Sequence, residues 1–200
     1  IGTEGEERSL RLELKLLADV GLVGFPNAGK STLIAAISAA RPKIADYPFT
    51  TLTPNLGIVR WGEKGSFAVA DIPGIIEGAH EGKGLGLQFL RHIERTSFLL
   101  YMIDVSEWAH EEPVKSFEIM RRELAAYDEP IITRPFAVVA TKIDVVGEGV
   151  RLRELQKYCK RHRYTCHPIS AATREGLTEL VTYVGQQVAQ LRAAPCEISS

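Results

Sequence analysis

The sequence has no long run of apolar residues among its 200 positions. A helix that crosses a membrane needs about 18 or more such residues in succession, and no stretch approaches that length. A basic segment followed by an apolar one, the mark of a secretory leader, is also missing from the first residues. We therefore expect no membrane span and a cytoplasmic location.

An excess of one charge is missing as well, since 24 Lys and Arg residues stand against 25 Asp and Glu residues. A net charge of −1 excludes a global attraction to nucleic acids or acidic membranes, so any RNA contact requires a local patch or another domain. Cysteine is scarce, and Cys159, Cys166 and Cys196 lack the paired spacing of a zinc site. They are expected to be reduced thiols.

The rest of the composition is that of a globular protein, with 45% hydrophobic and 24% charged residues. A chain of this length holds one substantial α/β core and is short for two, so we expect one domain and a monomer. The first residue is Ile1 rather than Met, which is typical of a fragment. Leucines alternate with polar residues over positions 10–16, which predicts a strand before the main core.

Apolar periodicity predicts strands that alternate with helices. Six segments have the pattern of strands: Val20–Val23, Gly57–Trp61, Ser66–Asp71, Phe98–Asp104, Pro135–Thr141 and Tyr164–Ile169. Five have the pattern of helices: Leu33–Ala40, Leu87–Arg95, Pro113–Tyr127, Arg151–Arg163 and Leu177–Leu191. Residues 41–56 predict a long functional loop. This order predicts an α/β fold with a mostly parallel six-stranded sheet, helices on both faces, and a ligand at the carboxyl ends of the strands.

The most informative segment is a phosphate-binding loop between the first strand and the first helix. It matches G-x-x-x-x-G-K-[ST] and is followed by Thr32; its residues are Gly24, Phe25, Pro26, Asn27, Ala28, Gly29, Lys30 and Ser31. The backbone N–H groups of such a loop and the N-terminus of the next helix form an anion site. We expect Lys30 to contact the β- and γ-phosphates of a nucleoside triphosphate, and Ser31 to bind Mg²⁺.

A carboxylate ends the third predicted strand in the segment Asp71, Ile72, Pro73 and Gly74. This is the position of a Walker B aspartate, which holds Mg²⁺ through water. We expect Asp71 in that role, with the N–H group of Gly74 at the γ-phosphate. Fold class and loop therefore predict a P-loop NTPase.

Four residues at the end of the fifth strand predict the choice of purine: Thr141, Lys142, Ile143 and Asp144. The Asp144 carboxylate can accept hydrogen bonds from both N1–H and N2–H₂ of guanine, whereas adenine offers no such pair of donors. The aliphatic stem of Lys142 is expected to cover the base. At the end of the last strand, Ser170, Ala171 and Ala172 are small enough for the backbone to approach guanine O6.

Three segments resemble stretches of the Obg family of bacterial GTPases. Residues 47–57 are similar to its switch I signature and contain Phe49, Thr50, Thr51, Leu52 and Thr53. Residues 71–79 are similar to its switch II signature, and residues 14–33 to the stretch that joins the N-terminal Obg domain to the GTPase domain. The resemblance implies a Ras-like GTPase domain over residues 18–192. Residues 1–17 would be a linker or the end of an Obg domain, and residues 193–200 a tail.

The resemblance also implies an activity. It implies a Mg²⁺-dependent enzyme that hydrolyses GTP to GDP and phosphate, and acts as a slow molecular switch in large ribosomal subunit assembly and in stress or growth control. Thr51 matches the switch I threonine that joins Mg²⁺ and the γ-phosphate, and Thr50 and Thr53 are the neighbouring alternatives. Release of this threonine after hydrolysis would operate the switch. Expected partners are GTP, GDP and ppGpp, together with the large ribosomal subunit or its rRNA.

Two positions depart from the common GTPase pattern. Thr141 stands where most of the class has Asn. The threonine keeps one hydroxyl but loses the amide that braces the phosphate loop and touches the purine, so guanine selectivity is expected to depend on Asp144. Ile75 and Ile76 stand where Ras-like enzymes carry a water-positioning glutamine, which agrees with the Obg pattern and predicts slow hydrolysis. Related GTPases with a G-x-P-N-x-G-K-S loop use the asparagine in a K⁺ site, so Asn27 predicts stimulation by K⁺.

The catalytic candidates are Asn27, Thr51 and Gly74. Three alternative functions make different demands on the sequence or on the activity. A nucleotide-gated binding module with negligible turnover would bind ribosomal particles without faster hydrolysis. A P-loop nucleoside kinase would carry an arginine-bearing lid, and an adenine-specific relative would depart at Asp144. Further groups that could orient water, or simply be solvated, are Glu77, His80 and Glu81.

Overall fold

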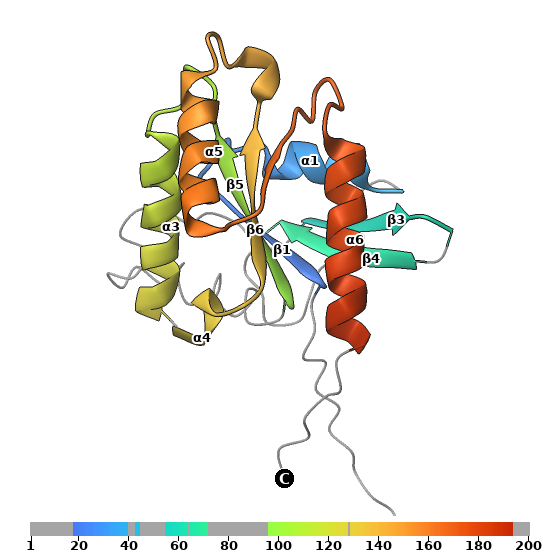
Figure 1. Cartoon of the computed structure of the whole chain (residues 1–200). Coiled ribbons are helices and arrows are strands. Elements are labelled where there is room, and N and C mark those ends of the chain that lie inside the picture. Colours follow the sequence, from blue (N-terminus) through green and yellow to red (C-terminus); the bar gives the residue numbers. More distant parts are fainter. Residues whose placement is uncertain are drawn as a thin grey trace, which may run out of the picture.

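One sheet forms the centre of the structure, a computed structural model that describes residues 18–39, 43–44, 55–63, 65–71, 96–127 and 129–193 (Figure 1). Its strand order is β2-β3-β4-β1-β5-β6-β7. The strands are β1 (Val20–Val23), β2 (Lys43–Ile44), β3 (Asn55–Trp61), β4 (Gly65–Asp71), β5 (Phe98–Asp104), β6 (Phe136–Thr141) and β7 (Cys166–Pro168). All neighbours from β4 to β7 pair in parallel, whereas β3 is antiparallel to both β2 and β4.

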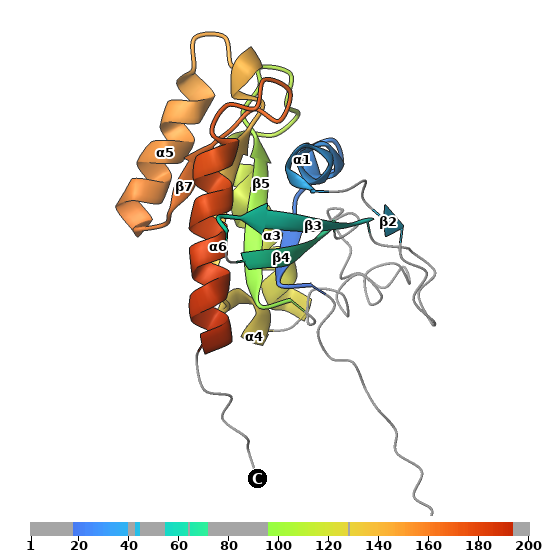
Figure 2. The same cartoon turned by 90° about the vertical axis from the view of Figure 1, so that its right-hand side faces the viewer.

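Helices cover both faces of this sheet. On one face lie α3 (Pro113–Tyr127) and α5 (Val150–His162), and on the other lie α1 (Lys30–Ile37) and α6 (Leu177–Ala193) (Figures 1 and 2). Two short elements connect the larger ones, α4 (Glu129–Ile132) and the 3-10 turn η2 (Ile143–Val145). Among the helices that the structure describes, none has the length and apolar character needed to cross a membrane.

The central strand β5 shows how the sequence divides between two hydrophobic cores. Leu99, Tyr101 and Ile103 belong to the core on the α3 and α5 side. Leu100 and Met102 belong to the core on the α1 and α6 side, and all five side chains are almost fully buried. Because successive side chains of a strand point to opposite faces, a continuous apolar run fits a strand that is covered on both.

An aromatic cluster fixes α3 and α5 against the sheet. The ring of Phe117 makes edge contacts with Tyr101 at 5.2 Å and with Tyr158 at 6.0 Å between ring centroids. The guanidinium group of Arg121 lies 4.9 Å from the centroid of Phe136. Aromatic pairs of this kind add about 0.5–1.5 kcal/mol beyond the burial of their area, so both helices keep a defined position beside β5 and β6.

The predicted fold class is confirmed, and the six predicted strands are all present. The predicted loop over residues 41–56 is wrong at both ends, because Lys43–Ile44 forms β2 and β3 begins at Asn55. Lys43 pairs with Leu56 across this short ladder, a non-local contact that apolar periodicity does not indicate. The four-residue helix α4 was not predicted either. The strand predicted over residues 10–16 and the helix predicted over residues 87–95 lie outside the described residues.

Helix α1 begins at Lys30, three residues before the predicted start at Leu33. Its N-cap is Gly29, which has a left-handed φ of 92°. Glycine adopts this conformation without steric cost, so the phosphate loop can turn directly into the helix. The helix ends at Ile37 because Ser38 is extended, and the N–H group of Ser38 donates to Ile34 O. The phosphate loop and the helix therefore form one continuous unit.

Helix α6 packs on the β3–β4 hairpin through the one glycine in its sequence. A Cβ atom at Gly185 would lie 2.2 Å from Cδ2 of Trp61, so the missing side chain is the space that the indole fills. Near the end of α6, Arg192 donates to both carboxylate oxygens of Asp19, at 3.0 and 2.8 Å. The helix is thereby joined to the residue that precedes β1.

We predict that Gly185→Ala lowers the free energy of unfolding by about 1–3 kcal/mol, because overpacking outweighs the helix propensity of alanine. In a Trp61→Leu background the same change should stabilise the protein by about 0.5–1 kcal/mol, since the clash is removed and propensity remains. Urea denaturation of the four proteins measures both effects. A gain in stability from Gly185→Ala in the wild-type background would contradict this packing.

Candidate nucleotide-binding site

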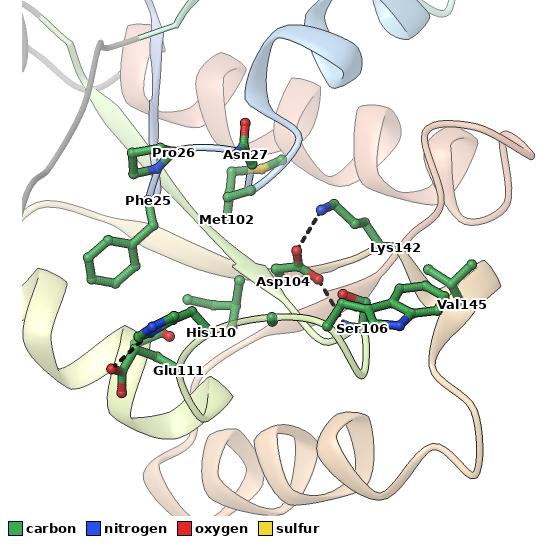
Figure 3. A pocket seen from close by; sticks show the side chains of 15 residues that line it. Phe25, Pro26, Asn27, Met102, Asp104, Ser106, His110, Glu111, Lys142 and Val145 are labelled. Carbon is green, nitrogen blue, oxygen red and sulfur yellow. Dashed lines mark hydrogen bonds and ion pairs between the residues drawn. The ribbon is translucent and has the colours of Figure 1, made fainter.

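The polar groups of the predicted site meet at the carboxyl edge of the parallel strands. The phosphate loop follows β1, Asp71 ends β4, Asp104 ends β5 and Thr141 ends β6. These strands are neighbours in the sheet, so groups that lie far apart in the sequence come together at one edge. Figure 3 shows the part of this edge between Phe25 and Val145.

The phosphate loop is held by its backbone and by its own lysine. Asn27 and Gly29 have positive φ angles of 62° and 92°. The buried ammonium group of Lys30 donates to the carbonyl oxygens of Gly24 at 2.9 Å and Phe25 at 3.1 Å. Burial lowers the pKa of Lys30 from its ordinary value, and the charge of Asp71 opposes the shift. A buried cation beside exposed loop residues suits an anionic ligand.

Ser31 and Asp71 bring the two predicted Mg²⁺ groups together. The Ser31 hydroxyl donates to Oδ2 of Asp71 at 2.7 Å. The second carboxylate oxygen, Oδ1, is buried and has no hydrogen-bond partner among the described residues. A buried oxygen without a partner is costly, and a hydrated cation would satisfy it. Mg²⁺ in phosphate sites takes one or two protein ligands together with phosphate oxygens, so this pair fits that ion.

Thr141 braces the phosphate loop through the hydroxyl that it keeps in place of the asparagine amide. Its hydroxyl lies 2.9 Å from Ala28 O and 3.2 Å from Ile103 O. Thr141 is buried at the end of β6, so the hydroxyl works in a water-poor position. The bond joins the loop after β1 to the strand that carries the purine segment, a function for which a hydroxyl on a short side chain is sufficient.

An ion pair between Asp104 and Lys142 was not predicted. Lys142 has a left-handed φ of 62°, and its ammonium group donates to Asp104 Oδ2 at 2.6 Å (Figure 3). The backbone N–H of Ser106 donates to the other oxygen at 2.9 Å. Burial by itself would raise the pKa of Asp104, but the hydrogen bonds from Lys142 and Ser106 outweigh it and lower the pKa. The sequence signal that could have indicated this ion pair is the carboxylate of Asp104 at the end of the strand beside β1.

Asp144 lies in the exposed turn η2, directly after Lys142. The N–H group of Ile143 donates to Ile169 O at 3.3 Å, which joins this turn to the segment that contains Ser170. The Ser170 hydroxyl is buried and accepts from the N–H group of Thr173 at 3.0 Å. Ala171 is half-buried and Ala172 exposed. The two predicted purine segments are therefore neighbours, and the Ser170 side chain stabilises its own turn.

A cavity of about 590 Å³ adjoins these groups. Phe25, Pro26 and Asn27 line it from the phosphate loop, and Asp104 and Lys142 line it from the strand ends (Figure 3). The loop after β5 completes it with Ser106, Trp108 and His110, among others. Asp144 and residues 170–172 are not part of this lining.

Several predicted site residues lie outside the described residues. These are Phe49, Thr50, Thr51, Leu52, Thr53, Ile72, Pro73 and Gly74. Ile75, Ile76, Glu77, His80 and Glu81 also lie there. Their roles stay predictions from the sequence, whereas the phosphate loop, Asp71 and both purine segments have a described geometry.

The chain is similar to proteins of known family. Residues 19–142 match the family described as 50S ribosome-binding GTPase. The chain is 56% identical over 187 residues to GTPase Obg of Thermodesulfovibrio yellowstonii, covering 94% of this chain and 56% of that protein. It is 52% identical over 191 residues to GTPase Obg of Aquifex aeolicus, covering 96% and 56%. The chain thus spans about half the length of the curated relatives that it matches.

Solved structures agree on the fold. A variant of Aquifex aeolicus Era bound to GDP.AlF4- has a TM-score of 0.63 at 28% identity, over 84% of this chain and 56% of that one. Era in complex with MgGDPNP and nucleotides 1506–1542 of 16S ribosomal RNA has a TM-score of 0.59 at 25% identity, over 84% and 55%. An S. thermophilus NFeoB mutant bound to GDP reaches 0.65 at 18% identity, over 88% and 65%, which supports the fold alone.

We predict that Thr141→Val lowers the free energy of unfolding by about 1–3 kcal/mol, because it removes the hydroxyl that bonds Ala28 O and leaves a buried acceptor short of a donor. The shape of the side chain is retained, so packing changes little. Thr182→Val is the matched control: the exposed Thr182 hydroxyl donates to Thr178 O at 2.8 Å. That change should stay within about 0.5 kcal/mol. Equal effects of the two variants in urea denaturation would contradict the brace.

Proposed function

Because the chain belongs to the 50S ribosome-binding GTPase family, and within it to the Obg GTPases, we propose that it binds GTP at this site and hydrolyses it to GDP and phosphate. The observation that carries the proposal is the Ser31–Asp71 hydrogen bond of 2.7 Å at the phosphate loop. The bond brings together two side chains that are 40 residues apart in the sequence and that would form the two halves of a Mg²⁺–phosphate site. Hydrolysis by this chain would have a slow unaided rate.

The triphosphate would be held by groups whose geometry is described. Lys30 already donates two hydrogen bonds to carbonyl oxygens of its own loop. Phosphate oxygens are stronger acceptors than carbonyls, so the ammonium group would exchange these partners for the β- and γ-phosphates. The backbone N–H groups at the start of α1 add a positive field.

Ser31 and Asp71 would hold Mg²⁺, Ser31 through its hydroxyl and Asp71 through water. The ion, when bound, supplies positive charge that neutralises the phosphates. Thr51 would complete the site in the triphosphate state, with the N–H group of Gly74 near the γ-phosphate. Loss of the γ-phosphate would release both segments, which is the basis of the proposed switch.

Guanine would be chosen by the turn that follows β6. The Asp104–Lys142 ion pair holds the ammonium group of Lys142 at the end of β5, so its aliphatic stem would be available to cover the base. Asp144, two residues after Lys142, is exposed. Its carboxylate would accept hydrogen bonds from N1–H and N2–H₂ of guanine. Residues 170–172 would approach guanine O6 with their backbone.

The partners follow from the relatives. Family members are described as binding the 50S ribosome, and a related Era structure contains 16S ribosomal RNA. We therefore propose that this protein acts in assembly of the large ribosomal subunit and in stress or growth control, as a cytoplasmic monomer that also binds ppGpp. Residues 18–192 would form the GTPase domain, with residues 1–17 a linker from an Obg domain and residues 193–200 a tail.

Asn27 would bind K⁺ and thereby supply the positive charge that an arginine finger supplies elsewhere. The residue is exposed at the tip of the phosphate loop, with a φ angle of 62°. Among the described residues nothing is hydrogen-bonded to its side-chain amide, so the amide oxygen is free to coordinate a cation. In Figure 3 this amide points away from Asp104 and Lys142.

The base preference is the direct test of the proposed function. We predict that the wild-type protein binds GTP and GDP but not ATP in the presence of Mg²⁺. Asp144→Asn should weaken GTP binding by at least about 100-fold, because the new amide presents a donor toward a donor of guanine. The same variant should gain affinity for xanthosine triphosphate, whose C2 carbonyl accepts that donor. Isothermal titration calorimetry with each nucleotide, and with ppGpp, measures this.

Glu148→Gln is the control for Asp144→Asn, since it removes an exposed carboxylate from the same connection between β6 and α5, at a position that is not among the predicted site residues. It should leave GTP affinity unchanged. Unchanged GTP affinity in Asp144→Asn, or no binding of guanine nucleotides by the wild-type protein, would refute the proposed function.

A second prediction concerns the cation. We predict that K⁺ accelerates single-turnover GTP hydrolysis at least about tenfold over Na⁺, and that Asn27→Ala loses this difference. Affinity for GDP, measured in parallel, should change little, because the amide would act on charge that develops at the γ-phosphate. Equal rates in Na⁺ and K⁺ for the wild-type protein would rule out this role of Asn27.

A further inference from the structure

Positive charge is concentrated on α5, although the whole chain has a net charge of −1. Residues 150–163 contain six of the 24 Lys and Arg residues and a single acidic residue, Glu154. This segment therefore carries +5, and the remaining residues together carry −6. A local patch of this kind is what a protein without a global positive charge needs in order to bind a polyanion.

Four of these cations occupy the outer face of the helix. Leu155 and Cys159 are the buried residues of α5 and mark the face that packs on the core. On the opposite face lie Arg153, Lys157, Lys160 and Arg161, all exposed, which we call the α5 basic face. At 1.5 Å per residue the four positions extend over about 12 Å of helix. In Figure 1, α5 lies beside α3, and Figure 2 shows α5 at the outer edge of the fold.

Internal structure accounts for one cation of this face, since the guanidinium group of Arg153 donates to Glu148 O at 2.7 Å. Within the described part of the chain, Lys157, Lys160 and Arg161 form no ion pair, so their charge is not used to stabilise the fold. Lys160 and Arg161 lie in the last turn, where cations favour the helix dipole. Arg153 lies in the first turn, where the dipole disfavours them, and Lys157 is mid-helix. The helix dipole therefore explains two of the four cations, Lys160 and Arg161, but not Arg153 or Lys157.

The loop that carries an exposed aromatic ring is bonded to the N-terminal end of α5. Trp108 is 78% exposed and belongs to the loop after β5. Arg151, in the first turn of α5, donates to the carbonyl oxygens of Ala109 and Glu111 and to the carboxylate of Glu112 at 3.1 Å. The loop that presents the indole is thus bonded to the same helix that presents the cations.

We propose that the α5 basic face, together with Trp108, binds RNA through its phosphates and one unpaired base. The inference rests on the proposed function and deepens it, since it assigns the surface with which this GTPase contacts RNA. Cations that follow the backbone and an aromatic side chain on which a base stacks are the two elements of recognition of single-stranded RNA.

The composition of the face favours RNA over a membrane surface. A helix that binds in a membrane interface needs an apolar face opposite its charges, and the apolar side of α5 is occupied by the core. Val150, 46% exposed, is the exposed large apolar residue of this helix. Trp108 adds a planar ring rather than a hydrophobic stripe, which suits stacking on a base.

The test is fluorescence anisotropy of a labelled single-stranded RNA of about 12 nucleotides, titrated with this chain at about 50 to 200 mM salt. Lys157→Gln/Lys160→Gln/Arg161→Gln should weaken binding about tenfold or more and reduce the slope of log affinity against log salt by about 2. Trp108→Ala should weaken binding by about 5- to 100-fold without changing that slope. RNA should also quench the tryptophan fluorescence of the wild-type protein, and Trp108→Ala should abolish the quenching.

The matched control is Arg60→Gln/Lys115→Gln/Arg122→Gln, which removes the same charge from exposed positions on other elements. It should bind RNA like the wild-type protein, and calorimetry should give equal GTP affinity for the wild-type protein, the triple α5 variant and this control. Equal loss of RNA affinity in the control, unchanged affinity in the α5 variant, or binding of anionic phosphatidylglycerol vesicles in place of RNA would each overturn the inference. If the protein binds GTP but not RNA, the inference is overturned and the proposed function stays intact. If it does not bind GTP, the proposed function is refuted separately.

Discussion

The parallel pairing of β1 with both β4 and β5 is the constraint on which the rest of the site depends. Leu22 pairs with Asp71 on one side and with Leu100 on the other, so the chain leaves β1 between two strand ends that carry carboxylates. Because β5 and β6 continue in parallel, Thr141 pairs with Asp104 at the same edge. The phosphate loop is thereby surrounded by side chains from three strands without any of them lying near it in sequence.

Burial gives these polar groups their importance. Lys30, Asp71 and Thr141 are all less than 10% exposed, and a buried polar group is costly unless it has a partner. Lys30 finds two carbonyl oxygens, Thr141 finds Ala28 O, and Asp71 finds Ser31 through one of its two oxygens. Oδ1 of Asp71 has no hydrogen-bond partner among the described residues, so a cation bound at this oxygen would offset the cost of burying it.

Helix α5 relates the proposed nucleotide site to the proposed RNA surface. The turn that carries Lys142 and Asp144 leads directly into its N-terminus, and Arg151 bonds its first turn to the loop after β5. That loop also supplies Ser106, which bonds Asp104, the partner of Lys142. The groups assigned to the base and to RNA are consequently attached to one packed unit of β5, β6 and α5.

Local sequence was sufficient to predict the phosphate loop and most of the strands and helices, because these depend on adjacent residues or on apolar periodicity. The roles of Lys30, Ser31 and Asp144 were predicted in the same way and stay predictions. Three contacts could be found only in the folded structure: the Asp104–Lys142 ion pair, the pairing of β2 with β3, and the hydrogen bond from Thr141 to Ala28 O. The last of these joins residues that are 113 positions apart in the sequence. The tertiary structure also decided that the cations of α5 face outward, since packing of Leu155 and Cys159 against the core sets the rotation of the helix. Such contacts depend on which surfaces meet when the sheet closes, and local residue order does not contain that information.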